Sequence, residues 1–413
     1  MKTLLKPISI IAAFASYAPM AQAGSPYAFQ TDAELAMVEP EKQPKPQAGL
    51  LTAGDYDDVL NPVLYKTYAE RMLQGSLSSK NLPYVDASNR INIRVVDTAG
   101  QTFPLADISV KKSNGEQTFA MRSAANGMSY LYPKYDDLEA GASLSVSAND
   151  MDAVEKTLTQ DLIQNGGDVT FDLRTMKKSI DKLDLLLTID ATGSMSDEMK
   201  YLQSELDSIV SRVKKSHPKV NIRHSLIVYR DKGDDYIVRA FPFTRDIAEF
   251  KKDLGAQEAN GGGDTPEAMD AALERGLKLK WRDDALKVNF LVADAPPHDR
   301  HISETWNAGL NSRYNGIHIV PIAGSGVDKT AEFMMRSMAQ ITNGRYVFLT
   351  DDSGIGNPHA EPTVDCYIVT RLDGLMSRIL NSLISGERQE PDANEIIRSV
   401  GTYKSGVCEL DIQ

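Results

Sequence analysis

The sequence predicts an α/β protein in which a doubly wound, mostly parallel sheet follows a small antiparallel β-sandwich. Two observations carry this prediction. From about residue 182 to 388, fully apolar stretches alternate with amphipathic helical stretches, which is typical of parallel strands covered by helices on both faces. From about residue 90 to 175, apolar residues instead recur at every second position, which is typical of strands with one buried face.

Length and composition set the broad class of the chain. Its 413 residues suit two or three domains, and 42% hydrophobic with 25% charged residues is the balance of a globular protein. The formal net charge of −12 argues against nucleic acid and anionic lipid as main partners. Beyond the N-terminus no stretch approaches the roughly 20 apolar residues of a membrane span, so no integral membrane segment is expected. The oligomeric state stays open.

Residues 1–23 have the features of a signal peptide. Lys2 and Lys6 make a basic start, an apolar stretch runs over 8–14, and residues 21–23 (Ala-Gln-Ala) form a small-x-small cleavage site. We therefore expect cleavage near Ala23 and export to a periplasm or out of the cell. The leader carries two lysines and no acidic residue, so its removal changes the net charge from −12 to −14.

Residues 24–86 are predicted to be a partly disordered arm, because Pro-rich and acidic segments such as 40–46 are mixed there. Within the arm, Leu64, Tyr68 and Met72 recur at helical spacing. This pattern predicts one short helix over 61–75 that docks on a domain.

The β-sandwich is predicted over residues 88–176. Apolar side chains alternate with polar ones in several short runs, and turn signals such as Asn114-Gly115 and Asn126-Gly127 separate the runs. The layout indicates about seven strands and weakly resembles carboxypeptidase-regulatory and transthyretin-like modules. Because no catalytic set is evident, we expect a spacer or packing domain.

The α/β domain is predicted over residues 182–388, with a C-terminal tail over 389–413. Its first strand, Leu183–Asp190, is apolar and ends on an acidic residue, and a helix is expected over 197–215. Further strands are expected at 222–229, 237–243, 288–293, 317–322 and 345–349, and further helices at 247–254, 266–279 and 329–341. In doubly wound folds, ligand sites lie at the carboxyl ends of the strands.

Three predicted loops bring oxygen ligands to that edge. Asp190, Thr192 and Ser194 follow the first strand, Thr265 follows a run of three glycines, and Asp294 ends another apolar strand. Two carboxylates and three hydroxyls match the ligand chemistry of Mg²⁺, with Mn²⁺ and Ca²⁺ as alternatives. Such a set leaves the ion able to accept one more anionic oxygen from outside.

These loops closely resemble the metal-ion-dependent adhesion site of a von Willebrand factor A domain. The resemblance covers about half of the chain, from residue 183 to 385. It implies that Ser194, Thr192 and Thr265 contact the ion directly or in alternation, while Asp190 and Asp294 act directly or through water. It also implies that the ion recruits an Asp or Glu carboxylate from a partner protein. Thr192 stands where serine is commoner, but it keeps the hydroxyl.

Two neighbouring clusters allow more than one interpretation. Residues 229–231 (Tyr-Arg-Asp), followed by Asp234 and Asp235, end a strand near the same rim, either as a specificity determinant or as a solvated charged turn. His298 and His301 invite a zinc site, but the sequence offers no evident third ligand.

The two cysteines of the chain are Cys366 and Cys408. An even count in an exported chain favours a disulfide, which would hold the tail beside the last helix. Spacing alone leaves two separate reduced thiols as the alternative.

The predicted function is therefore that of an exported, non-enzymatic protein for adhesion or scaffolding. The sequence has no Gly-x-Ser-x-Gly elbow, phosphate loop or His-Glu-x-x-His pair. Three alternatives stay open: a metal-dependent hydrolase with His298 as its nearest base, a cation that only rigidifies the loops, and a plain helix-capping role for Asp190 and Asp294.

Overall fold

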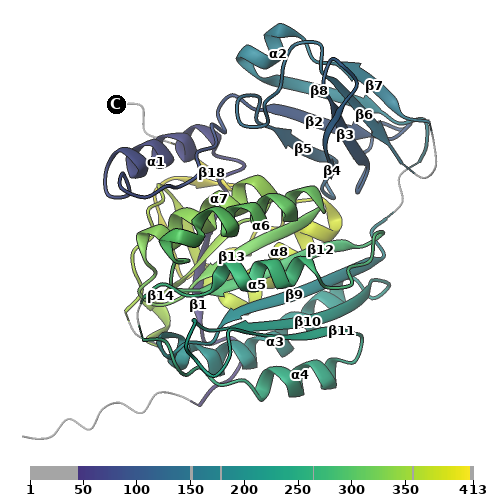
Figure 1. Ribbon diagram of the computed structural model, residues 1–413. Coiled ribbons are helices and arrows are strands. Elements are labelled where there is room, and N and C mark those ends of the chain that lie inside the picture. Colours follow the sequence, from purple (N-terminus) through teal and green to yellow (C-terminus); the bar gives the residue numbers. More distant parts are fainter. Residues whose placement is uncertain (1–44, 149–151, 177–178, 264, 356–357, 410–413) are drawn as a thin grey trace, which may run out of the picture. The chain divides into compact units, whose positions relative to one another are not determined.

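A computed structural model describes residues 45–148, 152–176, 179–263, 265–355 and 358–409 (Figure 1). Residues from Lys45 onward group into one compact unit. The predicted signal peptide and residues 24–44 of the predicted arm lie outside the described residues. None of the described helices is long and apolar enough to cross a membrane.

A nine-stranded sheet forms the centre of the α/β domain, in the order β11-β10-β9-β12-β13-β14-β1-β15-β16. The five strands from β10 to β14 in this order run parallel, and β11, β1, β15 and β16 pair antiparallel. The bounds are Thr52–Tyr56 (β1), Lys182–Asp190 (β9), Asn221–Tyr229 (β10), Val238–Thr244 (β11), Leu286–Ala293 (β12), Ile317–Ala323 (β13), Tyr346–Thr350 (β14), Tyr367–Arg371 (β15) and Arg398–Val400 (β16). The mostly parallel, doubly wound sheet predicted from the sequence is confirmed.

Helices cover both faces of this sheet (Figure 1). One layer holds α3 (Ser196–Ser216), α4 (Ile247–Gly255) and α8 (Leu372–Ser385), and the other holds α5 (Met269–Leu277), α6 (Ile302–Tyr314) and α7 (Lys329–Thr342). Each layer has its own apolar cluster, because side chains alternate across the strands: Leu185 and Leu187 face the α3 layer, whereas Leu186 faces the α5 layer.

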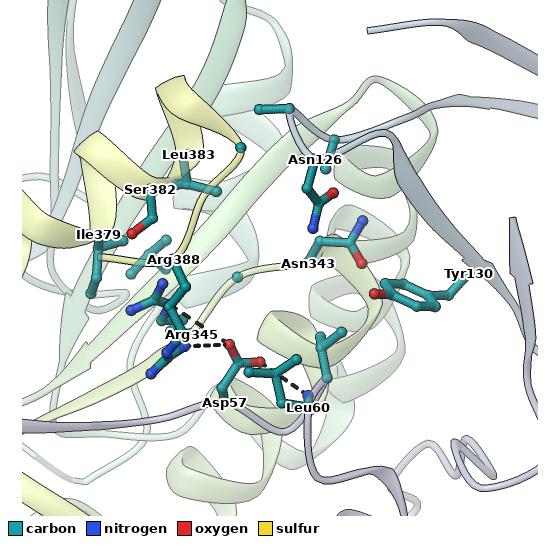
Figure 2. Close-up of a pocket in the computed structure, with 16 residues that line it drawn as sticks. Asp57, Leu60, Asn126, Tyr130, Asn343, Arg345, Ile379, Ser382, Leu383 and Arg388 are labelled. Atoms are coloured by element: carbon teal, nitrogen blue, oxygen red, sulfur yellow. Dashed lines mark hydrogen bonds and ion pairs between the residues drawn. The ribbon is translucent and has the colours of Figure 1, made fainter. Parts of the chain in front are cut away.

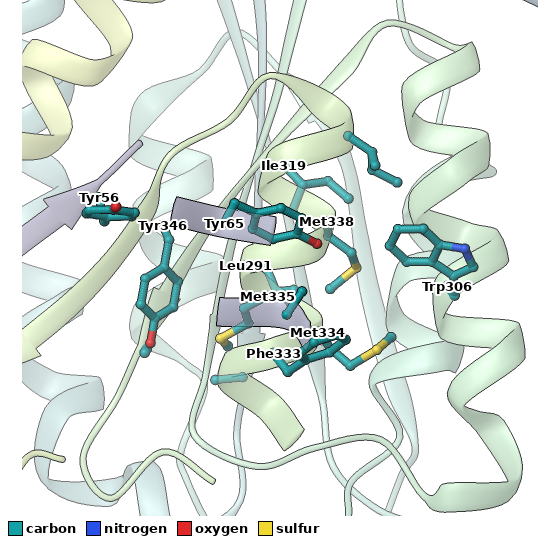
Figure 3. Close-up of a cluster of buried hydrophobic side chains, with 14 of the residues drawn as sticks. Tyr56, Tyr65, Leu291, Trp306, Ile319, Phe333, Met334, Met335, Met338 and Tyr346 are labelled. Carbon is teal, nitrogen blue, oxygen red and sulfur yellow. The ribbon is translucent and has the colours of Figure 1, made fainter. Parts of the chain in front are cut away.

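The apolar stripe of α7 lies in the core. Phe333, Met334 and Met338 are fully buried, and Figure 3 shows them gathered with Trp306 of α6 and Ile319 of β13. Unbranched methionines fit such irregular spaces between helices and a twisted sheet.

Strand β1 is the main departure from the predicted organisation, which assigns residues 52–56 to a partly disordered arm. β1 lies inside the sheet and pairs antiparallel with β14 and β15, with Gly54 opposite Phe348 and Val369. A Cβ on Gly54 would come within 2.6 Å of the Phe348 ring, so only glycine fits. The assignment of this strand to an arm is therefore wrong. The sequence gives no sign of the strand, because five residues carry little periodic signal and Thr52 pairs with Thr350, 298 positions away.

The helix expected over 61–75 is present as α1 (Pro62–Gln74). It buries Tyr65, Tyr68 and Met72 in the cluster that includes α7. The Tyr65 hydroxyl donates to Ser337 Oγ at 2.9 Å. This part of the predicted arm is thus packed into the core of the α/β domain.

Two facing sheets form the sandwich, in the orders β5-β2-β8 and β4-β3-β6-β7. The strands are Ile91–Val96 (β2), Asp107–Lys111 (β3), Gln117–Arg122 (β4), Met128–Leu131 (β5), Ser143–Ser147 (β6), Val154–Thr157 (β7) and Gly167–Asp172 (β8), with a short helix, Gln160–Asn165 (α2), before β8. The alternating apolar residues predicted to face inward do so, and Ile91, Ile93, Ile108 and Val146 are all fully buried. The pairing is antiparallel except between β2 and β8, which run parallel.

A buried ion pair ties the sandwich strands to α6. Arg313 Nη1 and Nη2 donate to the two carboxylate oxygens of Asp136 at 2.7 and 2.9 Å, and Nη2 also donates to the Tyr130 carbonyl at 2.8 Å. Both charged side chains are at most 4% exposed. Helix α6 is absent from the expected helices because polar residues such as Arg313 interrupt its apolar stripe. The ion pair with Asp136 accounts for the burial of Arg313.

The tail folds back onto the α/β domain. Cys366 and Cys408 form the predicted disulfide, with 5.5 Å between their Cα atoms. Cys408 belongs to a small hairpin of β17 (Tyr403–Lys404) and β18 (Val407–Cys408), and its backbone N–H donates to Asn61 Oδ1 at 2.9 Å.

A small hollow of about 130 Å³ lies where the segment before α1, the sandwich and the end of α8 meet (Figure 2). Arg388 and Arg345 point into it, and both pair with Asp57, at 2.8 and 3.7 Å. Both arginines also pair with Asp55, at 3.5 and 3.4 Å, so two carboxylates balance the two guanidinium groups of the hollow.

Candidate metal centre

The predicted ligand residues meet at the carboxyl ends of β9 and β12, which are neighbouring parallel strands. Asp190 is the last residue of β9 and Asp294 directly follows β12, so both carboxylates leave the sheet side by side. Thr192, Ser194, Thr265 and Asp294 line one open hollow of about 460 Å³. Asp190 is completely buried beside it, whereas the residues Ser194 and Thr265 are exposed.

Hydrogen bonds shape the first ligand loop. Asp190 Oδ1 accepts from the Thr192 backbone N–H at 2.9 Å and from Thr192 Oγ1 at 2.6 Å. Thr192 Oγ1 lies 3.3 Å from Ser194 Oγ, so the three side chains follow one another into the turn Gly193–Met195 that begins α3. Asp190 Oδ2 is buried with no well-aligned hydrogen bond, although the neighbouring Tyr229 hydroxyl helps to lower the pKa of Asp190. A better donor or a cation would stabilise this oxygen.

The carboxylates of the site repel one another. Burial and the charge of Asp294 raise the pKa of Asp190 to about 7. Burial and the nearby Asp190, Asp231, Asp234 and Asp294 carboxylates raise the pKa of Glu267 to about 9. Like charges held together in a dry site favour protonation, and a divalent cation relieves the same repulsion. The residues present therefore fit a divalent cation: two crowded carboxylates, an unsatisfied oxygen and three hydroxyls.

Neither aspartate serves as a helix cap. The N-cap of α3 is Met195, and the short turn Asp299–His301 after Asp294 has His298 as its N-cap. Neither aspartate therefore occupies the N-cap position of these two elements.

The turn after β10 braces the ligand loops. Arg230 and Asp231 are each only 6% exposed, so the turn is not simply solvated. Arg230 donates to the backbone carbonyls of Ala191 and Glu258 at 3.1 and 2.9 Å. The sequence placed this turn near the rim but gave no sign that its arginine would be buried there.

The two histidines do not form a zinc site. His298 Nε2 lies 2.7 Å from Asp231 Oδ1, and the His298 and His301 rings are 6.2 Å apart. Across the described residues, no group of three or more His, Cys, Asp or Glu side chains is arranged to hold a metal ion. A cation at the carboxyl edge of the sheet would thus depend on the hydroxyls as well as the carboxylates.

One acidic residue of the hollow escaped the sequence analysis. Glu267 is 3% exposed, lines the hollow with Thr192 and Asp294, and leaves its Oε2 without a hydrogen bond. The sequence signal was its place two residues after Thr265, just before a helix, where an acidic residue is ordinary.

Comparison with known proteins defines the class of this domain. A family model for the von Willebrand factor A domain matches residues 184–355. The chain therefore contains a von Willebrand factor A domain, as the resemblance of its loops predicted, and this match spans β9 to the end of the turn after β14.

Two curated proteins share part of the sequence. The chain is 22% identical to the alpha-protein kinase vwkA of Dictyostelium discoideum over 259 residues, which is 59% of this chain and 40% of that protein. It is 35% identical to the putative ariadne-like RING finger protein R811 of Acanthamoeba polyphaga mimivirus over 121 residues, which is 29% of this chain and 11% of that protein. The matches thus span less than half the length of these relatives.

Among solved structures, the crystal structure of the conserved hypothetical protein BatB from Bacteroides thetaiotaomicron covers 49% of this chain and 98% of its own. With a TM-score of 0.34 and 11% identity, the likeness adds nothing to the description of the fold.

Proposed function

We propose that this protein binds other proteins through a divalent cation at the carboxyl edge of its von Willebrand factor A domain. Asp190, Thr192, Ser194, Thr265 and Asp294 would hold the cation, and an Asp or Glu of the partner would complete its coordination. The observation that carries the proposal is the pair of crowded aspartates, one fully buried with an unsatisfied oxygen, beside three hydroxyls that face an open hollow.

Each group has a distinct part in this proposal. Asp190 and Asp294 supply two negative charges, which balance a divalent cation, and Thr192, Ser194 and Thr265 add neutral oxygens. When bound, the cation supplies a coordination position that still attracts an outside carboxylate. Because Ser194 and Thr265 are exposed at the mouth of the hollow, a side chain from a partner can reach that position. Oxygen-only ligation favours Mg²⁺, with Mn²⁺ and Ca²⁺ as alternatives.

The place of action that we propose is outside the cytoplasm. The basic and apolar N-terminal segment with its small-x-small site supports export, and so does the disulfide between Cys366 and Cys408, since disulfides persist in oxidising compartments. A periplasmic protein and a secreted protein both fit these features.

The hydrolase alternative gains no support from the geometry. His298, its nearest base by sequence, is not among the residues that line the hollow with Thr192, Ser194 and Asp294. The kinase activity in the name of the Dictyostelium protein belongs to a chain of which the match covers 40%, so it is not transferred here.

The test is partner capture by the full-length chain from the envelope and secreted fractions of the source cells, with Mg²⁺ or with a chelator. We expect a discrete protein to be captured with Mg²⁺ only, and Asp190→Ala to abolish its capture. Glu274→Ala is the control, since the Glu274 side chain is 50% exposed on α5 and pairs with Lys278 of the same helix. Capture that persists unchanged in the metal-free protein would refute the proposal and favour a purely structural cation.

A further inference from the structure

The first turn of α3 carries a completely buried carboxylate, Glu198, shortly after the ligand residue Ser194. Glu198 Oε1 accepts from the Ser325 backbone N–H at 2.8 Å and from the Ser325 hydroxyl, and it lies 3.1 Å from His359 Nε2. The other carboxylate oxygen, Oε2, is buried without a hydrogen bond among the described residues. A carboxylate removed from water is strongly destabilised unless a positive charge lies beside it. His359, when protonated, is that charge for Glu198.

The His359 side chain lies between two carboxylates and is only 3% exposed. Its Nε2 faces Glu198 of α3, and its Nδ1 lies 2.8 Å from Asp351 Oδ1 in the turn after β14. Ser325 Oγ, from the loop after β13, is 3.3 Å from Nε2. Among the described residues, Glu198 and Asp351 are the charged groups that face the ring. Only the protonated ring donates through both nitrogens, so a neutral ring must give up its hydrogen bond to one of the two carboxylates.

Ser325 connects this cluster to the metal centre. It lines the hollow together with the ligand residues Ser194 and Asp294. Its loop is held against the end of β12, because the Asp328 N–H donates to the Asp294 carbonyl at 3.0 Å. On the other side, the turn that carries Ser194 runs directly into α3. Glu198 thus joins the two parts of the site that carry Ser194 and Asp294.

We propose that His359 is a pH-sensitive positioning residue of the metal centre: its protonated ring holds Glu198, and with it the start of α3, in the arrangement that binds the cation. The inference rests on the cation-dependent function proposed above. Once His359 is neutral, water can solvate Asp351, whose side chain is 64% exposed, but Glu198 stays buried without a positive charge beside it. The link between the Ser194 turn and the Asp294 loop weakens as a result, and the cation is held less tightly.

This pH dependence has the opposite sign to that of the aspartates. A proton on Asp190 competes with the cation, so that effect strengthens cation binding as pH rises. Burial opposes the charge of His359, but hydrogen bonds to Glu198 and Asp351 raise its pKa above the usual 6.5. Cation binding should weaken as pH rises through that pKa. Because His359→Gln keeps the aspartate effect and has no charge to lose, the ratio of wild-type to variant affinity isolates the contribution of His359.

The first experiment measures Mn²⁺ affinity by electron paramagnetic resonance from about pH 5.5 to about pH 8.5, with the full-length wild-type protein, His359→Gln and His217→Gln. His217 is the matched control, since it occupies the C-cap at the opposite end of α3. At the acid end, we expect the wild-type protein to bind Mn²⁺ roughly 10-fold more tightly than His359→Gln, the smaller effect of losing a group that supports metal ligands. The two affinities should converge at the alkaline end, and His217→Gln should follow the wild-type protein throughout.

The second experiment uses the wild-type protein alone. If a proton on His359 strengthens cation binding about 10-fold, reciprocity requires the cation to raise the pKa of His359 by about 1. Nuclear magnetic resonance of protein labelled with ¹³C-histidine measures this pKa with and without saturating Mg²⁺. Direct repulsion between the cation and the imidazolium would lower the pKa instead, so the sign of the change distinguishes positioning from repulsion.

The outcomes separate this inference from the proposed function. A wild-type protein that binds neither Mn²⁺ nor Mg²⁺ at any pH would end the cation-dependent function, and the inference with it. Cation binding with a pH-independent ratio between wild type and His359→Gln would overturn the inference alone, and so would a His359 pKa that Mg²⁺ leaves unchanged or lowers. If circular dichroism shows that His359→Gln does not fold, the titration of the wild-type protein decides the question by itself.

Discussion

Replacing Asp190 with asparagine should stabilise the metal-free protein at neutral pH and remove its response to the cation. Asp190 is fully buried, and burial together with Asp294 raises its pKa from 3.8 to about 7. Because the folded state holds this proton more tightly than the unfolded state, the stability of the metal-free protein falls as pH rises from about 4 to about 7.

The size of the effect follows from that pKa difference. About three pKa units at about 1.4 kcal/mol each correspond to roughly 4 kcal/mol of destabilisation, fully expressed above pH 7. Asparagine keeps an oxygen for the two hydrogen bonds from Thr192 and carries no charge toward Asp294. In chelator, Asp190→Asn should therefore raise the free energy of unfolding by up to about 4 kcal/mol at pH 8 and change it little at pH 4.

Urea denaturation followed by circular dichroism tests this between pH 4 and 8, in chelator and in Mg²⁺. Mg²⁺ at about 100 times its dissociation constant should add about 2.7 kcal/mol to the wild-type protein at pH 8 and nothing to Asp190→Asn. Glu274→Gln, on the exposed face of α5, should behave as wild type in both conditions. Two results together would refute the reasoning. In chelator, the free energy of unfolding of the wild-type protein would not fall between pH 4 and 7, and Asp190→Asn would be no more stable than the wild-type protein at pH 8.

Three further predictions concern the surrounding structure. Arg313→Met leaves Asp136 buried without its partner and should lower the free energy of unfolding by about 3–5 kcal/mol in urea denaturation. The double variant with Asp136→Leu should recover much of this loss. A double variant as unstable as Arg313→Met would contradict the prediction. Reducing the disulfide, which closes a loop of 42 positions, should lower the free energy of unfolding by about 4 kcal/mol, measured with and without dithiothreitol. Burial opposes the charge of His359, but hydrogen bonds to Glu198 and Asp351 raise its pKa. The charged His359 therefore stabilises the fold fully below about pH 6.5, and this contribution is lost as pH rises through the folded-state pKa. His359→Gln should flatten that part of the pH profile, and a profile identical to wild type would exclude the effect.

Long, strongly patterned elements of this protein could be predicted from the sequence. The expected strand over 183–190 and helix over 329–341 are observed at Lys182–Asp190 and Lys329–Thr342, because each carries enough apolar periodicity of its own. Strand β1 and helix α6 were missed for the opposite reason. Strand β1 is short and has no apolar periodicity. The burial of Arg313 in α6 is explained by its ion pair with Asp136, which the sequence does not reveal.

The residues of the candidate site also fall into a group that the sequence predicts and a group that it does not. Asp190, Thr192 and Ser194 lie on one loop, and Asp294 ends a strand next to theirs, so strand order alone brought them together. Glu267 and Arg230 contribute through contacts with distant backbone that no local pattern encodes.

What the sequence by itself determined is the class of the domain and the chemistry offered at its carboxyl edge, since apolar runs and ligand spacing are local properties of the chain. Only the tertiary structure decided that residues 52–56 complete the sheet, that Arg230 is buried against the ligand loops and that a third acidic group faces the hollow. These features depend on which surfaces exclude water once the chain has folded, and burial decides the charge and the pairing of a side chain more strongly than its neighbours in sequence do.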